Sequence, residues 1–340
     1  MNVLFYGGCH AQVLHRIFSE CFTSEISSEL LINYKLIAEL DGFPYEKLEG
    51  VDVVVYSPIV SKEHWNTIHL EKFCRENNIK TISYPWLEWH GYFPECSKGS
   101  FLGGRTWIYK KLEVLAKSIR TFDSFIRAVL DVETIAHENL EKTTGKLKHQ
   151  EESCKLDVVV TDFIMKNYQE KRLFLLPDHP TKVLYEYVAT AIADRLGLTF
   201  SSEFFQSMAE PQAGDEIPIL PIVKKELGLR FEGERFANKE ILKTAKIFSF
   251  TEYAEIFFFA NKDFKFFSST RPTFIKQELA YSADISSNRK MEVGTGTLIM
   301  ASHVELHSDG HFILTNRQRS EEEVVSPFYI YSEHWSELLT

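Results

Sequence analysis

The chain has 340 residues, more than one hydrophobic core usually serves, so we expect one large domain and a smaller second unit. Hydrophobic residues make up 44% of it and the formal net charge is −10, which excludes nucleic acid as a main partner. The five cysteines are scattered without a Cys-x-x-Cys pair, which predicts a reducing, cytoplasmic environment rather than disulfides or zinc. We find no secretory signal and no apolar run of membrane-spanning length.

The N-terminal stretch predicts a strand, a tight turn and a helix. Residues 3–6 form a continuous apolar run, two glycines follow, and apolar residues then recur at helical spacing. Cys9 therefore lies at a helix start, where unpaired N–H groups and the helix dipole favour a thiolate. The alternative is that Cys9 is a small apolar residue filling the junction.

Further strands and helices alternate along the chain in the manner of βαβ units. We predict strands at 34–40, 52–56, 79–84 and 156–160, a helix at 62–77, and amphipathic helical structure over 106–150. This order predicts an α/β fold with a doubly wound, mostly parallel sheet, in which ligands bind beyond the carboxyl ends of the strands. The aromatic loop at 86–94 is either a wall of that site or packing against the sheet.

His179 is the second candidate for chemistry. It precedes Pro180, which suits the first turn of a helix whose apolar face ends at Gly197. We therefore expect His179 at a helix N-terminus, where the dipole keeps imidazole neutral and able to accept a proton, although it could simply cap that helix.

The C-terminal part is less informative. Glycine and proline residues, which interrupt helices and strands, accumulate over 199–235. We therefore divide the chain into a catalytic domain at 1–212 and an α+β region at 213–340. We expect a helix at 238–259, a hairpin from 297–306 and 311–315, and an exposed helix start at 321–323. His303, His307 and His311 lack a carboxylate constellation, so we predict no metal site.

Five motifs in this order resemble a polysaccharide biosynthesis acetyltransferase family of bacterial capsule loci, over about residues 1–200. They are residues 6–10, 56–59, 84–85 with 91–94, 157–164, and 172–174 with 178–181. The resemblance implies an SGNH-hydrolase-like fold, binding of coenzyme A with acetyl-CoA as donor, and a capsular or other cell-surface sugar as acceptor. By position, Cys9 matches the cysteine that replaces the SGNH serine, and His179 matches the histidine of a His-Pro motif.

The chain also departs from that family. It has a glycine and a histidine beside Cys9 where the family reads Gly-Asn-Cys-Gln, and the Gly-x-Asn-Asp block is missing. Arg105 follows the aromatic loop and is a candidate cation for the pyrophosphate. The complete set of candidate contacts to substrate or coenzyme A is Gly7, Gly8, His10, Gln12, Ser57, Pro58, Tyr84, Tyr92, Arg105, Asp162 and Asp178.

Three functions are compatible with these residues. The first is an acyl-CoA-dependent O-acetyltransferase acting on a sugar hydroxyl, either through a Cys9 thioester or by direct attack after His179 removes the hydroxyl proton. The second is an esterase acting on acylated glycans. The third is a non-catalytic protein that binds glycans or nucleotides through the aromatic loop. A dinucleotide-binding oxidoreductase is disfavoured because the third glycine of Gly-x-Gly-x-x-Gly is missing.

Overall fold

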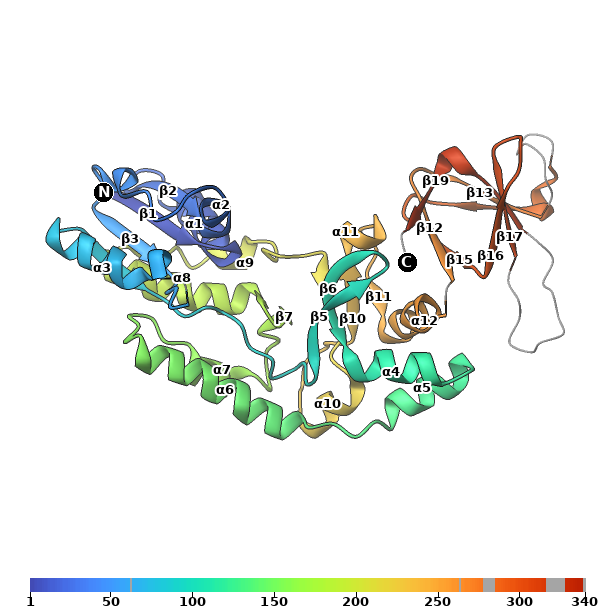
Figure 1. Ribbon diagram of the computed structural model, residues 1–340, viewed down its shortest axis with the longest axis horizontal. Coiled ribbons are helices and arrows are strands. Elements are labelled where there is room, and N and C mark those ends of the chain that lie inside the picture. The colour runs from blue at the N-terminus through green and yellow to red at the C-terminus, as the bar shows by residue number, and fades with distance from the viewer. Residues whose placement is uncertain (62, 263, 278–284, 316–327, 339–340) are drawn as a thin grey trace. The chain divides into compact units, whose positions relative to one another are not determined.

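The computed structural model describes residues 1–61, 63–262, 264–277, 285–315 and 328–338 (Figure 1). Its contacts divide the chain into two compact units. Unit 1 comprises residues 1–92, 136–213 and 227–231, and unit 2 comprises residues 93–135, 214–226 and 232–340. The predicted division at 212/213 differs from these units, because residues 93–135 group with the C-terminal part of the chain.

Unit 1 is built on a four-stranded parallel sheet with strand order β2-β1-β3-β4. Its elements are β1 (Asn2–Gly7), α1 (Cys9–Cys21), β2 (Ser27–Ile32), α2 (Asn33–Glu39), η1 (Tyr45–Leu48), β3 (Val53–Tyr56), η2 (Glu63–Trp65), α3 (Thr67–Glu76), β4 (Lys80–Ser83), α6 (Ala136–Ser153), α7 (Thr161–Asn167), β7 (Phe174–Leu176), β8 (His179–Pro180), α8 (Lys182–Leu196) and α9 (Phe204–Ser207).

The two faces of this sheet bury alternate side chains of β1. Phe5 packs against His15 and Phe18 of α1, with ring centroids 5.8 and 5.3 Å apart. Tyr6 belongs instead to a core cluster that includes Leu70 of α3. Because successive residues of a strand point to opposite faces, the continuous apolar run of β1 indicates burial on both sides.

Unit 2 contains antiparallel sheets and short helices. Its elements are β5 (Cys96–Phe101), β6 (Gly104–Tyr109), α4 (Lys110–Ser118), α5 (Phe122–Leu130), β9 (Asp215–Glu216), α10 (Pro221–Glu226), β10 (Arg235–Asn238), α11 (Lys239–Leu242), β11 (Phe248–Ser249), α12 (Phe250–Ala260), β12 (Lys265–Ser269), β13 (Thr273–Lys276), η4 (Ser287–Arg289), β14 (Lys290–Val293), β15 (Leu298–Ala301), β16 (His303–Leu306), β17 (His311–Thr315), β18 (Phe328–Tyr331), η5 (Ser332–His334) and β19 (Trp335–Leu338).

The mixed α/β class and the parallel arrangement are confirmed, and the strands predicted at 52–56 and 79–84 are β3 and β4. The hairpin predicted from 297–306 and 311–315 includes the antiparallel pair β16 and β17. In its turn, the Asp309 carboxylate lies 2.9 Å from His307 Nδ1 and 3.1 Å from His311 Nδ1. The finer assignment to an SGNH-hydrolase-like fold stays a prediction, and the predicted helix start at 321–323 lies outside the described residues.

Two predicted strands of unit 1 are wrong. Residues 34–40 lie mainly in helix α2, and the strand beside β1 is β2, whose partly exposed edge position explains its polar sequence. Residues 156–160 form no strand, although Val158 N–H donates to the Ser83 carbonyl. The Asp157 carboxylate accepts from the Ser83 N–H at 2.8 Å, so it occupies a donor that a neighbouring strand would need.

Three predicted helices also differ from the structure. Residues 106–109 belong to β6 before α4, α5 and α6 begin, and residues 238–259 are divided between α11, β11 and α12. Lys243 has φ of 52°, which ends α11, and Ser249 forms a capping box with Glu252 that starts α12. Helix α8 begins at Lys182, after Thr181, so Pro180 is not in its first turn.

Candidate functional site

Cys9 is the first residue of α1, one residue beyond the end of β1. Gly8 is the N-cap of α1, and its carbonyl accepts the first helical hydrogen bond from Gln12 N–H at 3.2 Å. The Cys9 side chain is half-buried. Cys9 therefore stands at a helix start, as the sequence predicted, where the positive end of the helix dipole favours a thiolate.

The two glycines before Cys9 make space for neighbouring side chains. A Cβ at Gly7 would lie 3.0 Å from the Ala11 Cβ and 3.3 Å from the Tyr84 hydroxyl. A Cβ at Gly8 would lie 3.3 Å from the ring of Trp86. Larger residues here would displace groups that surround the start of α1, so both glycines serve close packing in this turn.

His10 is completely buried, and its Nε2 lies 2.9 Å from the carbonyl oxygen of Asp178. Because a carbonyl only accepts, Nε2 carries the proton, and Nδ1 keeps a lone pair with no hydrogen-bond partner among the described residues. Burial lowers the pKa of His10 to about 4, although the Asp178 carbonyl partly opposes this shift. The ring is therefore neutral at pH 7.

The hydrogen bond from His10 to Asp178 joins the two segments that carry the candidate catalytic residues. His10 follows Cys9 directly, and Asp178 directly precedes His179. His179 is half-buried in β8, which pairs with β7. We therefore correct the position predicted for His179: it lies in a short strand two residues before the N-cap of α8, not at the helix N-terminus.

Trp86 and Glu88 line the same region and were not predicted individually. The Trp86 ring lies 4.4 Å from the His10 ring, and its Nε1 donates to Glu88 at 3.1 Å. His90 Nε2 also lies 3.1 Å from Glu88, and this hydrogen bond lowers the pKa of the Glu88 carboxyl. The aromatic loop gave a sequence signal for Trp86, whereas nothing in the sequence singled out Glu88.

Several hydroxyl groups are buried near the carboxyl edge of the sheet. Tyr84 follows β4 and Ser57 follows β3, and neither hydroxyl has a hydrogen-bond partner among the described residues. Burial, and then the charge of Cys9, raise the pKa of Tyr84. The same two causes raise the pKa of Tyr185, a residue of α8 that sequence reasoning missed and whose hydroxyl donates to Gln212 at 3.0 Å.

Other predicted contacts are placed elsewhere. Tyr92 is fully buried in the core, and its hydroxyl shares its proton between the backbone carbonyls of Tyr168 and Lys171 at 2.8 and 3.0 Å. Asp162 is exposed in the first turn of α7. Arg105 lies in β6 of unit 2. Gln12 and Pro58 are half-buried, in α1 and after β3 respectively.

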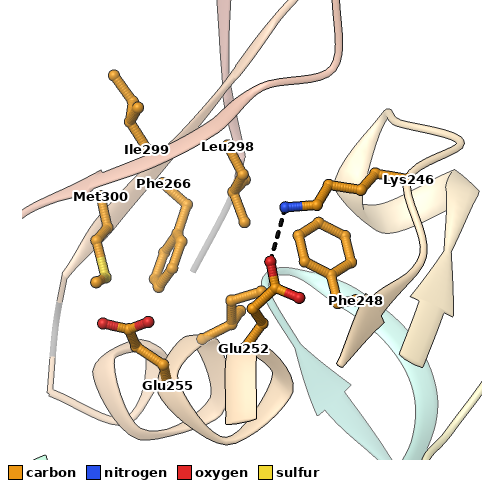
Figure 2. A pocket seen from close by; sticks show the side chains of 9 residues that line it. Lys246, Phe248, Glu252, Glu255, Phe266, Leu298, Ile299 and Met300 are labelled. Carbon is orange, nitrogen blue, oxygen red and sulfur yellow. Dashed lines mark hydrogen bonds and ion pairs between the residues drawn. The ribbon is translucent and has the colours of Figure 1, made fainter. Parts of the chain in front are cut away.

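Unit 2 has a cavity of about 130 Å³ that is open to solvent (Figure 2). It lies between β11 and α12 on one side and β12 and β15 on the other, and Lys246 at its rim forms an ion pair of 2.8 Å with Glu252. Phe248 and Phe266 line it, but they are only 2% and 0% exposed and so offer little ring surface to a ligand. It contains no residue predicted for the site.

A helix able to cross a lipid bilayer would need a long apolar sequence, and within the described residues no helix meets that requirement.

Comparison with known proteins gave two matches. The model of a family described as polysaccharide biosynthesis enzyme WcbI matches residues 2–201. A solved structure described as WcbI, a novel polysaccharide biosynthesis enzyme, in its native form without a disulfide bond between coenzyme A and a cysteine, is 18% identical with a TM-score of 0.58. The similarity covers 77% of this chain and 89% of that one and concerns the fold. No curated protein sequence matches the chain.

Proposed function

Because the chain belongs to the WcbI family of polysaccharide biosynthesis enzymes, we propose that it transfers the acetyl group of acetyl-CoA to a sugar hydroxyl and releases coenzyme A. The observation that carries this proposal is the 2.9 Å hydrogen bond between His10 and the Asp178 carbonyl. This hydrogen bond supports a shared site for the nucleophile Cys9 and the base His179, since Cys9 directly precedes His10 and His179 directly follows Asp178. A nucleophile and a base on converging segments suit acyl transfer.

Coenzyme A as the donor is supported by two observations. The similar solved structure is described in relation to coenzyme A and one of its own cysteines. In this chain, a half-buried thiol at a helix start lies in the same region as a buried imidazole lone pair and a buried hydroxyl without partners among the described residues. Such groups suit a ligand that brings its own donors and acceptors into the site. Bound acetyl-CoA would supply an activated acyl group.

In the proposed reaction, Cys9 Sγ attacks the acetyl carbonyl carbon as a thiolate. A new C–S bond forms on Cys9 while the C–S bond to coenzyme A breaks, and coenzyme A leaves as a thiolate that takes up a proton. This exchange of one thioester for another is nearly isoenergetic. The N–H groups at the start of α1 stabilise the developing oxyanion, an effect commonly worth about 3 kcal/mol.

His179 acts in the second half of the reaction. Its imidazole accepts the proton of the sugar hydroxyl, whose oxygen attacks the Cys9 thioester and releases the thiolate. If the hydroxyl instead attacks the donor directly, His179 has the same role and Cys9 never carries the acetyl group. We assign the acceptor to capsular or other surface polysaccharide, because the family is one of polysaccharide biosynthesis enzymes. We assign the reaction to the cytoplasm, because the five cysteines are scattered without a Cys-x-x-Cys pair.

The test combines transfer kinetics with mass spectrometry. Release of coenzyme A from acetyl-CoA is measured with candidate sugars, and the peptide containing Cys9 is analysed for acetylation without acceptor. We expect His179→Ala to slow transfer about a hundredfold or more, and Cys9→Ala to abolish both transfer and acetylation of that peptide.

Two substitutions provide matched controls. Cys21→Ala removes a half-buried thiol at the other end of α1, and His149→Ala removes an exposed histidine of α6. Both should transfer at the wild-type rate. Transfer without acetylation of Cys9 would favour the direct route, whereas full transfer by Cys9→Ala and His179→Ala would contradict the proposed site.

A further inference from the structure

The hydroxyl of Tyr84 is a buried donor without a hydrogen-bond partner among the described residues. The residue is 0% exposed, and its backbone is held by the bond from its N–H to the Tyr56 carbonyl at 3.0 Å. Leaving such a hydroxyl unpaired inside a protein costs free energy, so an unpaired one in an ordered strand end calls for an explanation. A neighbouring side chain that becomes a strong hydrogen-bond acceptor only when it is ionised would provide that explanation.

The phenol ring of Tyr84 extends across the carboxyl edge of the sheet toward the start of α1. Because Tyr6, Tyr56 and Ser83 are aligned in register on β1, β3 and β4, the residues that follow them lie side by side at this edge. The Tyr84 hydroxyl reaches the position next to Gly7, where a Cβ would lie only 3.3 Å from it. Gly7 thus leaves room for this hydroxyl, two residues before Cys9.

We propose that Tyr84 is a positioning residue that donates a hydrogen bond to the Cys9 thiolate. The absence of a side chain at Gly7 is required for the Tyr84 hydroxyl to reach the thiolate. A thiolate accepts strongly and a neutral thiol only weakly, so the hydroxyl gains its partner when Cys9 ionises. The hydrogen bond therefore favours the nucleophilic form, in addition to the N–H groups at the start of α1.

Electrostatics agree with this placement. Burial raises the pKa of Tyr84, and the charge of Cys9 raises it further, so the phenol stays protonated as a donor wherever the thiolate exists. Two neighbouring groups are accounted for: His10, next to Cys9 on α1, is a neutral ring bonded to the Asp178 carbonyl, and the Tyr185 hydroxyl of α8 donates to Gln212. Glu88 forms its hydrogen bonds with Trp86 and His90.

The inference rests on the proposed role of Cys9 as nucleophile, but its test needs no coenzyme A. The rate at which iodoacetamide alkylates Cys9 is measured against pH, with the modified peptide quantified by mass spectrometry and Cys21 as internal reference. Tyr84→Phe removes only the hydroxyl. We expect the midpoint of the Cys9 profile to rise by about one pH unit or more, since the charged thiolate loses the hydrogen bond that the Tyr84 hydroxyl donates to it.

Tyr6→Phe is the matched control. Its hydroxyl is also buried without a partner among the described residues, but it belongs to the core cluster on the other face of the sheet, beside Phe43. This variant should keep the wild-type midpoint. At a pH where Cys9 is a neutral thiol, Tyr84→Phe should also melt at the wild-type temperature or above it, because the lost hydroxyl then has no partner among the described residues. A purely structural role would lower the melting temperature.

The outcomes separate this inference from the proposed function. An unchanged Cys9 midpoint in Tyr84→Phe, or an equal shift in Tyr6→Phe, would overturn the role of Tyr84 even if the wild-type enzyme transfers acetyl groups. A selective shift in Tyr84→Phe would support that role even if no transfer to any sugar were found.

Discussion

At the scale of single residues, burial determines the protonation of the histidine beside the candidate nucleophile. His10 is completely enclosed, and within the part of the chain that the structure describes its hydrogen bond is made through an N–H donor. A second proton would have to be taken up at Nδ1, a buried atom without a partner there. This explains why its pKa falls to about 4. Its hydrogen bond ties the 178–179 segment to α1, and its ring is neutral at pH 7.

We predict that His10 makes the stability of unit 1 depend on pH. Its pKa is about 6.5 unfolded and about 4 folded, so between these values the unfolded chain binds more protons. Lowering the pH from 7 to 5 should therefore cost the fold about 2 kcal/mol through this group. Urea unfolding at several pH values, followed by tryptophan fluorescence, measures the change.

His10→Gln is the control for this titration. The glutamine amide can donate to the Asp178 carbonyl but does not ionise in this range. The difference in unfolding free energy between the wild type and this variant should change with pH, because all other titrating groups are common to both. If the two proteins lost stability in parallel from pH 7 to 5, the lowered pKa of His10 would be contradicted.

At the scale of elements, the junction between β1 and α1 is too tightly packed for a side chain at its first glycine. A Cβ at Gly7 would be 3.0 Å from Ala11, which is held within α1, and next to the Tyr84 hydroxyl. Helix α6 offers the opposite case: Gly145 lies within it, and no neighbouring side chain or backbone comes within 4 Å of its Cβ position.

We therefore predict opposite effects of the same substitution in unit 1. Gly7→Ala should destabilise unit 1 by about 1–3 kcal/mol through overpacking and should slow alkylation of Cys9. Gly145→Ala should stabilise it by about 1 kcal/mol, since alanine favours a helix interior, and should leave Cys9 unchanged. Thermal unfolding of both variants provides the measurement. A tolerated Gly7→Ala would mean that the junction can widen.

At the scale of the whole molecule, the predicted site residues are not spread evenly over the two units. Unit 1 carries Cys9, His10, Tyr84 and His179, whereas unit 2 contributes Arg105 from β6. Ligand binding to unit 1 should therefore affect the two units differently, because a ligand stabilises the structure that it contacts.

We predict that coenzyme A slows amide hydrogen exchange at residues 7–12, 84–90 and 176–180. Strands β16 and β17 of unit 2 should exchange at the same rate with and without it. The measurement is exchange followed by mass spectrometry with coenzyme A well above its dissociation constant, and adenosine alone as the control. Protection confined to β16 and β17 would contradict the proposed binding site.

The two candidate catalytic residues were accessible from the sequence by different reasoning. Cys9 was placed correctly at a helix start, because an apolar strand, two glycines and a change of period are local signals. His179 was selected for a helix position that it does not occupy, since α8 begins only after Thr181. The segment that carries His179 is tied to the first turn of α1 by the hydrogen bond between His10 and Asp178. These two residues are 168 positions apart in the chain, and no local sequence pattern encodes such a contact.

The sequence alone determined the α/β class, the strand–glycine–cysteine–helix junction and the family resemblance, because each depends on short local patterns and on their order along the chain. Only the tertiary structure showed which polar groups are buried without partners among the described residues. It also showed that the Asp157 carboxylate accepts the hydrogen bond of the Ser83 N–H and that Tyr92 belongs to the core. Those outcomes depend on what long-range folding places around each group, and burial and hydrogen bonding are properties of that environment rather than of the residue itself.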